Sequence, residues 1–508
     1  MAIGLPLSKF LMSISQFWMG AAWLANGNFA KKWQRLEKNF KLFLPFLGIY
    51  LTNFIGIFWS SNLSYAVHDI KVKLPFLLIP FMVSTMPGIS ISNYYRLLKI
   101  FLGSVSLGIV VSLWFYFGFG DKPIQDIREI SRFISHIRFS LMVSLGIFIC
   151  IFLYWKDKEN QSWIWIMLAT LFTAFLFILH SSTGIGISLI GALFTLLYFL
   201  SKNKHSKSLK FIAGLVLFVV GFALWEIITV WKTSFPEPVP IHTQLIKNGR
   251  YLYYNDTTYK DRENGNYIWV NVEIVGLKKA WQHRTHPTKE DSAFTNQIFV
   301  LVRYLSSLGL PKDSESVMQL SQNQIADIQR GCTNYKFCNK LDPRYRIYQT
   351  LWEIEDYRNQ GNADGHSVVM RLEFWKAAWN ILKKHSLLGI GTGDVGDELK
   401  KSYNEINSQL NPEFRLRAHN QYLTFALAVG LLGLILIFYF IFCWIRNIPS
   451  DPNRNYFAWI FIGISLFSML NEDTLETQAG VSFVAFFATL FFTIQLNPET
   501  NPIEEKEA

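Results

Sequence analysis

The sequence has 508 residues, of which 51% are hydrophobic, 16% are aromatic and only 17% are charged, against about 25% charged in an ordinary soluble domain. Its formal net charge is +11, but much of the lysine and arginine lies in short loops beside apolar runs, which argues against nucleic-acid binding. The apolar runs are continuous and about 18–22 residues long, as helices that cross a bilayer require. The composition therefore excludes a soluble globular protein, and the absence of alternation excludes a β-barrel.

The apolar runs predict an all-α polytopic membrane protein with about eleven spans. Residues 74–88 and 456–471 are short for a span. The lack of a basic region before the first apolar run argues against a cleavable signal peptide. The expected spans are residues 8–27, 42–59, 74–88, 97–118, 138–155, 162–180, 183–200, 210–231, 422–445, 456–471 and 479–496.

Basic residues alternate between the loops, which predicts the topology. Loops such as 28–41 and 202–209 are rich in lysine or arginine, whereas 472–478 has neither, so the basic loops are expected in the cytoplasm. The N-terminus and a large loop then lie outside. We expect four parts: a bundle of about eight helices at 1–231, a large loop domain at 232–421, three spans at 422–496 and a cytoplasmic tail at 497–508.

The large loop, about 190 residues long, is far longer than a simple connection between two helices needs to be. Residues 250–254 and 267–272 flank a polar stretch and predict a β-hairpin. Residues 294–309 and 314–330 predict helices.

Four cysteines raise the question of pairing. Cys150 and Cys443 lie in apolar spans and are expected to be buried thiols. Cys332 and Cys338 lie close together in the loop and could form a disulfide outside the cytoplasm, or remain two thiols. A zinc site would need further ligands at fitting spacing, and the sequence offers none.

Arg371 begins a pattern that predicts an amphipathic helix over 371–384. Leu372, Trp375, Trp379 and Leu382 recur at helical spacing and form an aromatic face suited to a membrane surface. Arg371 is expected at the helix N-terminus, where the helix dipole favours phosphate. The alternative is an exposed charge without function.

The glycine-rich run Gly389-Ile-Gly391-Thr-Gly393 is similar to a phosphate cradle. A helix precedes it, however, where the nucleotide-binding fingerprint requires a strand. We therefore predict that these glycines permit a tight turn and a close backbone approach.

His419 lies just before the ninth span, beside Arg415 and Arg417. A histidine at the interface can move a proton near neutral pH, and arginines hold phosphate oxygens. The alternative is a cluster that only anchors the helix in the interface. Other ionisable groups are expected at the same outer side, which suggests one outward-facing cleft: His136, Arg138, His180, Glu226, Glu472, Asp473 and Glu476.

These motifs together resemble the O-antigen ligase superfamily, which includes O-antigen ligases, O-antigen polymerases and bacterial protein O-oligosaccharyltransferases. The resemblance rests on Arg371 heading an aromatic helix, on His385-Ser-Leu-Leu-Gly-Ile-Gly-Thr-Gly, and on His419-Asn420-Gln-Tyr422-Leu running into Ala428-Val-Gly430-Leu-Leu-Gly433. It implies a metal-independent, inverting glycosyltransferase of the membrane-embedded C type, without a cofactor, in the bacterial inner membrane with its loop in the periplasm.

The resemblance also implies roles for particular residues. The donor is a glycan on undecaprenyl diphosphate, and the acceptor is lipid A-core or another glycan. Arg371 would bind the diphosphate, and His419 would accept the proton of the acceptor hydroxyl or orient the acceptor. Asn420 and Tyr422 are candidates for supporting this site. From their charge and position rather than from the resemblance, Arg417, Arg138 and His136 are expected to bind the diphosphate or the acceptor.

One position departs from the pattern of the superfamily. Members usually carry an arginine where this chain has Ser182, and Arg138 could supply the missing charge. The pair Arg371 and His419 is expected to face one cleft.

Several functions remain open within and beyond this resemblance. A ligase is preferred to a polymerase, and no residue decides between them. A transporter or flippase of lipid-linked sugars is the alternative from another class, although inverted repeats are absent from the sequence. A scaffolding membrane protein is the third.

Overall fold

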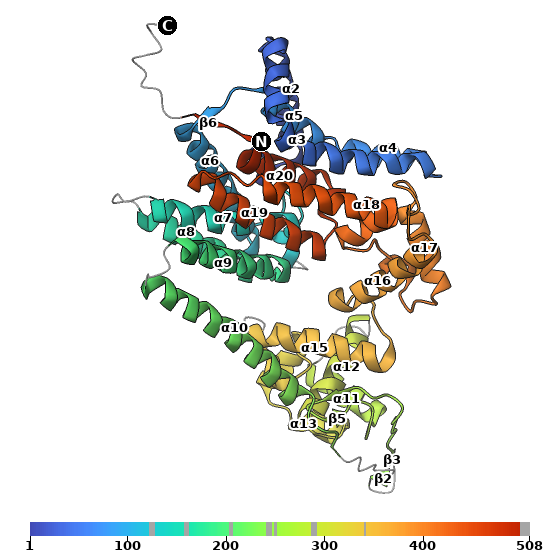
Figure 1. The fold of residues 1–508 in the computed structure, drawn as a ribbon. Helices are drawn as coiled ribbons and strands as arrows, with labels where there is room; N and C mark the ends of the chain where they lie inside the picture. Colours follow the sequence, from blue (N-terminus) through green and yellow to red (C-terminus); the bar gives the residue numbers. More distant parts are fainter. Residues whose placement is uncertain are drawn as a thin grey trace. The chain divides into compact units, whose positions relative to one another are not determined.

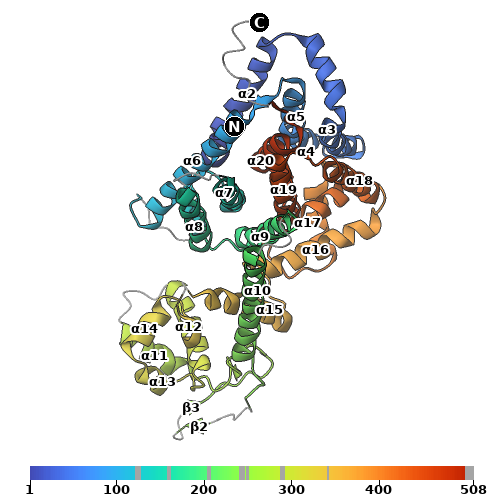
Figure 2. The same cartoon turned by 60° about the vertical axis from the view of Figure 1, so that its left-hand side comes forward.

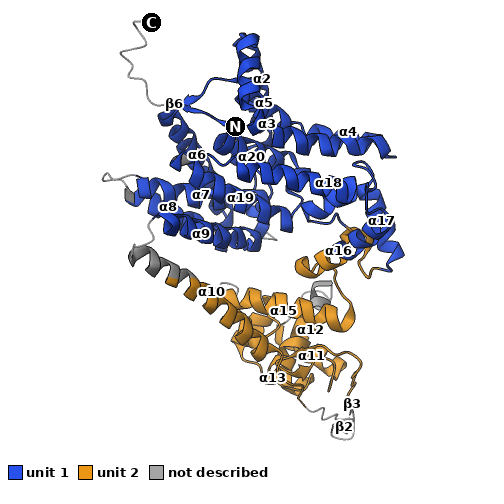
Figure 3. Cartoon of the chain, in the orientation of Figure 1, with its two compact units in different colours: residues 1–213, 374–407, 416–508 blue, residues 214–373, 408–415 orange. Residues whose placement is uncertain are grey.

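The computed structural model describes residues 1–120, 127–156, 162–202, 207–239, 246–247, 251–285, 292–339 and 342–497. The chain forms two compact units (Figure 3). The first comprises residues 1–213, 374–407 and 416–508, and the second comprises 214–373 and 408–415. Two helices change unit along their length: α10 (Lys207–Ser234) at Gly214 and α16 (Ser367–Lys384) at Phe374. The four-part division predicted from membrane sidedness stays a prediction.

The fold is almost entirely helical (Figure 1). The elements of the first unit are α1 (Gly4–Leu7), α2 (Lys9–Ala25), α3 (Phe29–Ile55), η1 (Gly56–Trp59), α4 (Leu63–Lys73), α5 (Pro75–Thr85), β1 (Ile89–Ser90), α6 (Ile91–Tyr116), η2 (Ile127–Ile130), α7 (His136–Lys156), α8 (Ser162–Ile178), α9 (Ser182–Lys202), α17 (Val395–Glu405), α18 (Gln421–Arg446), α19 (Pro452–Asn471), η5 (Thr474–Glu476), α20 (Gln478–Ala488), η6 (Thr489–Thr493) and β6 (Leu496–Asn497). β1 and β6 pair in parallel, with Ile89 opposite Leu496.

Six helices in the described part of the chain are long and apolar enough to cross a membrane, which confirms an all-α polytopic class. Two further apolar helices are shorter, at Trp163–Ile178 and Gln478–Thr493. Every span expected from the sequence coincides with a helix, but the number of eleven stays a prediction. The six are Phe29–Trp59, Ile91–Tyr116, His136–Lys156, Ser182–Lys202, Leu217–Ser234 and Gln421–Arg446.

Small residues allow close packing in the first unit. α7 packs against both α8 and α9, as two views show (Figures 1 and 2). A Cβ on Gly184 would lie 2.8 Å from the Ser140 Cβ, and one on Gly191 would lie 2.2 Å from the Phe148 ring. Glycines at these two positions of α9 therefore let it approach α7, which is how helices associate where lipid offers no hydrophobic drive.

The glycine-rich run makes a close backbone approach, as predicted. α18 breaks at Gly430, where φ is 69° and ψ is −171°. The Ile390 and Gly391 amides donate to the carbonyls of Leu427 and Ala428, at 2.8 and 3.0 Å. The run thus satisfies carbonyls that the break in α18 leaves without an intrahelical donor. A Cβ at Gly430 would lie 2.1 Å from the Leu387 carbonyl oxygen.

The end of this run, Gly393, and the residue after it, Asp394, bind the start of α4. The Asp394 carboxylate accepts from the amides of Ser61 and Asn62, both at 2.7 Å. The Gly393 amide donates to Ser60 Oγ at 2.9 Å, and a Cβ there would lie 2.2 Å from the Asn62 carbonyl oxygen. Asn62 in turn caps α4 by accepting from the Tyr65 amide.

The second unit has its own hydrophobic core. The elements wholly within it are β2 (Ile246–Lys247), β3 (Tyr251–Leu252), β4 (Arg262–Glu263), β5 (Asn266–Tyr267), α11 (Ile274–Thr285), α12 (Ser292–Ser307), α13 (Ser314–Gln319), α14 (Gln322–Gln329), η3 (Tyr335–Phe337), α15 (Pro343–Gln360) and η4 (Pro412–Phe414). Buried side chains, mostly from α11 to α14, form the core, and Trp281 is fully buried in it. Cys332 packs against it and is bonded to Cys338, which settles the pairing that the sequence left open.

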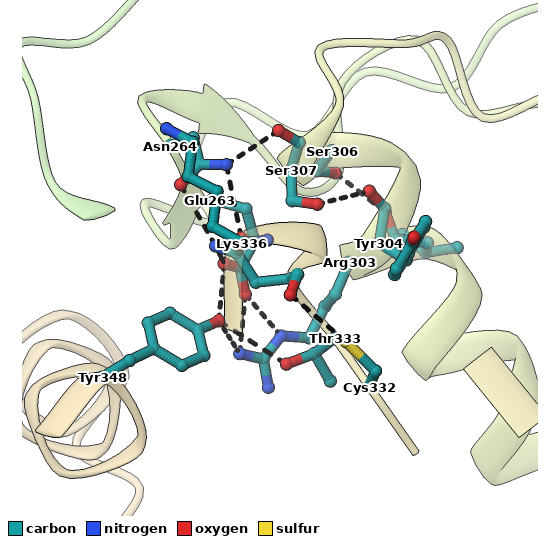
Figure 4. Close-up of polar contacts among 12 residues, drawn as sticks. Glu263, Asn264, Arg303, Tyr304, Ser306, Ser307, Cys332, Thr333, Lys336 and Tyr348 are labelled. Carbon is teal, nitrogen blue, oxygen red and sulfur yellow. Dashed lines mark hydrogen bonds and ion pairs between the residues drawn. The ribbon is translucent and has the colours of Figure 1, made fainter. Parts of the chain in front are cut away.

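A buried carboxylate organises the polar interior of this unit (Figure 4). Glu263 is 1% exposed and accepts from Arg303 Nε at 2.8 Å, from the Tyr348 hydroxyl at 2.6 Å and from the Asn334 amide at 2.9 Å. The Arg303 guanidinium also lies 3.5 Å from the centre of the Trp352 ring. The buried Glu263 carboxylate is thus paired and hydrogen-bonded by side chains from three distant segments, as a buried charge requires.

Two local expectations in the loop need correction. Tyr254 and Val272 form an isolated antiparallel bridge. In the described part of the chain, however, β3 pairs with β2 and β5 pairs with β4, so the two predicted strands do not pair along their length. The helix predicted over 314–330 is two helices, because Ser321 forms a capping box with Gln324 and starts α14 anew.

Candidate functional site

His419 occupies an unusual backbone position directly before α18. Its φ is 46°, a left-handed conformation that is uncommon outside glycine and costs energy. Its amide donates to Asp473 Oδ2 at 3.2 Å, and Nδ1 lies 3.2 Å from Glu472 Oε2. The ring stacks on Phe374 of α16, with centroids 5.5 Å apart. The backbone and the ring are therefore both held in place.

The Glu472 contact selects the tautomer of His419. An ionised carboxylate only accepts hydrogen bonds, so Nδ1 carries the proton and donates it. Nε2 then bears the lone pair and is the basic nitrogen. A third of the imidazole (32%) is exposed, whereas the Glu472 side chain is 4% exposed. A histidine that acts as a base requires its ring and tautomer to be fixed in this way.

The segment 472–477, between α19 and α20, collects several predicted site residues. Arg138 of α7 donates from Nη2 to the Asp473 carbonyl at 2.9 Å and from Nε to the Thr477 hydroxyl at 3.2 Å. The Asp473 carboxylate also accepts from the Thr424 hydroxyl at 2.7 Å. Burial raises the pKa of Asp473. Arg138 and His419, far apart in sequence, therefore both bind Asp473, the arginine at its backbone carbonyl and the histidine amide at its carboxylate.

A second group of charges lies beside the first, which we term the α4 charge cluster: Asp69, Lys73, Arg417 and Glu476. Lys73 Nζ pairs with Asp69 and lies 2.9 Å from Glu476 Oε1. Arg417 Nη1 lies 3.1 Å from Glu476 Oε2 and donates to the Tyr65 hydroxyl at 3.0 Å. Burial opposes the charge of Glu476, but Lys73 and Arg417 hold its pKa well below the ordinary value.

Asn420 and Tyr422 act on α18 itself. Asn420 is the N-cap of α18, and its side-chain oxygen accepts from the amides of Tyr422 and Leu423 at 3.0 and 3.1 Å. The Tyr422 hydroxyl donates to the Leu466 carbonyl of α19 at 3.0 Å, and its ring stacks on Phe438. Both side chains thus fix the start of α18, next to His419.

Arg371 lies one turn inside α16, because the helix begins at Ser367 rather than at Arg371. This corrects the expectation of a position at the helix N-terminus. Its Nη1 donates to the Ser367 carbonyl at 2.7 Å. Arg371 belongs to the second unit and His419 to the first, so their shared cleft stays a prediction.

The faces of α16 differ in burial, and the amphipathic helix expected over 371–384 at the membrane surface stays a prediction. In the part of α16 that belongs to the first unit, the buried face is Phe374, Ala377, Ala378 and Ile381, whereas Trp379 is 57% exposed. Trp375 is held by its indole, which donates to the Ala418 carbonyl at 3.1 Å.

Two other predicted residues are placed by the helices that carry them. His136 is the first residue of α7, half-buried and two residues before Arg138. Glu226 of α10 pairs in two-pronged fashion with Arg344 of α15, at 2.7 and 2.9 Å, within the second unit. That ion pair ties the two helices together and accounts for a charge near the end of an apolar helix.

Sequence reasoning missed the contribution of α4. Tyr65, Asp69 and Lys73 lie in a short loop between spans and carry no motif. The one available signal was the spacing of Asp69 and Lys73, four residues apart on a helix, where opposite charges pair. Their approach to Glu476, about 400 residues later, depends on the tertiary fold.

Comparison with known proteins agrees with the predicted resemblance. Residues 313–438 match the model of the O-Antigen ligase family. This range contains Arg371, the glycine-rich run, Arg417, His419 and the break in α18, and it confirms the resemblance to the O-antigen ligase superfamily over that part of the chain. No curated protein matches the chain. The match indicates an enzyme of ligase or polymerase type in a multi-pass membrane protein.

Proposed function

We propose that the protein is an inner-membrane glycosyltransferase that moves a glycan from undecaprenyl diphosphate to a glycan acceptor, lipid A-core, at the periplasmic face. The acceptor hydroxyl attacks the anomeric carbon, and a new glycosidic bond forms as the bond to the diphosphate oxygen breaks. The hydroxyl proton passes to His419 Nε2, and the lipid diphosphate leaves with the bonding electrons. No metal is required in this scheme, because arginines stabilise the charge on the leaving group.

The observation that carries this proposal is the pairing of His419 with Glu472. A base needs a fixed tautomer and a fixed ring, and Glu472, Asp473 and Phe374 supply both. The pair lies at the start of α18, with His419 inside the region that matches the O-Antigen ligase family. A structural anchor in the interface would not need a strained backbone supported by two buried carboxylates.

Arg138 is the candidate for the arginine that the superfamily pattern expects at Ser182. Ser182 begins α9, and a Cβ added at Gly184 would lie 2.8 Å from the Ser140 Cβ of α7. Arg138 is about half a helical turn from Ser140. It therefore reaches the same end of the helix pair from the neighbouring helix.

In vitro transfer tests the proposal. Purified protein in EDTA receives undecaprenyl-diphosphate glycan with and without lipid A-core, and His419→Ala is compared with wild type. Glycan on lipid A-core that disappears in the variant supports the ligase. Longer glycans that remain on the lipid carrier indicate the polymerase instead. Absence of any product, with donor crossing the bilayer of proteoliposomes, would refute transfer and indicate a flippase.

A further inference from the structure

α4 contributes a buried lysine, Lys73, to the site. The proposed reaction gives this lysine no role that would explain the desolvation free energy of burying its charge. The Lys73 and Asp69 side chains are 7% and 5% exposed, and the Glu476 side chain is 4% exposed. Removing a charged side chain from water is expensive and is repaid only by close partners. Lys73 and Asp69 would neutralise each other without help, yet Lys73 also reaches Glu476 at 2.9 Å.

Glu476 is the point where the two cations meet. One oxygen, Oε1, accepts from Lys73 and from the Gln421 amide at 2.9 Å, and the other, Oε2, pairs with Arg417 at 3.1 Å. Arg417 therefore shares its carboxylate with Lys73 instead of holding it alone. Its side chain is 26% exposed, and its Nε is buried without a hydrogen-bond partner among the described residues.

The charges in the α4 charge cluster sum to zero when all four groups are ionised, two cations against two carboxylates. Without Lys73 the cluster would carry a net charge of −1, and Glu476 would neutralise Arg417. An anionic ligand approaching Arg417 would then meet net repulsion. With Lys73 present, the carboxylate orients Arg417 and leaves its positive charge effective.

We propose that Lys73 is a positioning residue that compensates Glu476, so that Arg417 is held rigidly by Glu476 and Tyr65 and still attracts the phosphate oxygens of an anionic donor. The proposal rests on the proposed function, in which the donor is a lipid diphosphate. It assigns α4, a helix outside the matched region, to donor affinity. Lys73 itself touches no reacting atom in this scheme.

The test is donor kinetics of three variants in full-length protein. Lys73→Met removes the charge and keeps the stem, Lys73→Arg restores the charge, and Lys71→Met is the matched control on the exposed side of α4. We expect Lys73→Met to raise the donor KM, with little change in kcat, because the cluster then repels an anionic donor. The rise should be limited to roughly tenfold, because water screens the partly exposed Arg417. Lys73→Arg is expected to recover most of the affinity, and Lys71→Met to behave as wild type.

A second variant tests the proposal if Lys73→Met fails to fold. Tyr65→Phe removes only the hydroxyl that accepts from Arg417, and we expect it to weaken competitive inhibition by inorganic pyrophosphate about threefold. Unchanged donor KM in folded Lys73→Met overturns the proposal, as does unchanged pyrophosphate inhibition in Tyr65→Phe. If wild type itself transfers no glycan, the proposed function fails, and that outcome is separate from either result.

Discussion

Replacing Glu472 by glutamine tests the proposed role of His419 as the base. The amide keeps the size of the side chain but loses the charge, and it can turn either its oxygen or its nitrogen toward Nδ1 of His419. A hydrogen bond to a charged partner contributes about 1.5–3 kcal/mol. The imidazole is 32% exposed, so water screens the pair, and the lower figure of about 1.5 kcal/mol applies.

That energy corresponds to about a tenfold fall in the rate of transfer, since about 1.4 kcal/mol is a factor of ten. We expect Glu472→Gln to lower kcat about tenfold, while the donor KM changes little, because the lost contact orients the base and does not bind the donor. The assay is single-turnover transfer from undecaprenyl-diphosphate glycan to lipid A-core with enzyme in excess, which isolates chemistry from product release.

Glu405→Gln provides the control. Glu405 is an exposed glutamate of α17 that pairs with Lys384, so its change should leave single-turnover transfer as in wild type. Full kcat in folded Glu472→Gln would refute the view that the carboxylate orients His419 for catalysis. A loss of thermal stability alongside unchanged kcat would instead make Glu472 a structural residue.

Three further predictions concern titration, cross-linking and backbone. Burial and the neighbouring Glu476 raise the pKa of Asp69 to about 7. Asp69 therefore gains a proton as pH falls through about 7, and the α4 charge cluster becomes more positive. We expect the donor KM to fall over the same range, as measured from about pH 6 to pH 8. Asp69→Asn should abolish this pH dependence of KM. Reduction of Cys332–Cys338 should lower the free energy of unfolding by about 2 kcal/mol, because the closed loop is short; an unchanged melting temperature in dithiothreitol would contradict this. Gly430→Ala should prevent folding of detergent-purified protein, since both its φ and the nearby Leu387 carbonyl oppose a side chain; a monodisperse variant with wild-type melting would be the contrary result.

The sequence predicts the membrane helices and the close backbone approach of the glycine-rich run, and both have a local physical cause. A helix in lipid must satisfy every backbone group internally and present apolar side chains for its whole length, so every expected span coincides with a helix. Local chemistry was also readable: the glycines at 389–393 predicted a close backbone approach, which the bonds from Ile390 and Gly391 to α18 confirm. The break in the helix at 320–321 was missed, because a capping box competes with helical propensity over only a few residues.

The apolar pattern is enough to predict an all-α membrane protein and to place His419 and Arg417 directly before a span. The contacts of those two residues, in contrast, follow from the tertiary structure. Glu472 and Glu476 come from a turn more than fifty residues later, and Lys73 comes from a helix at the other end of the chain. A buried charge is stable only beside its opposite, and no local pattern records which distant segment supplies that partner.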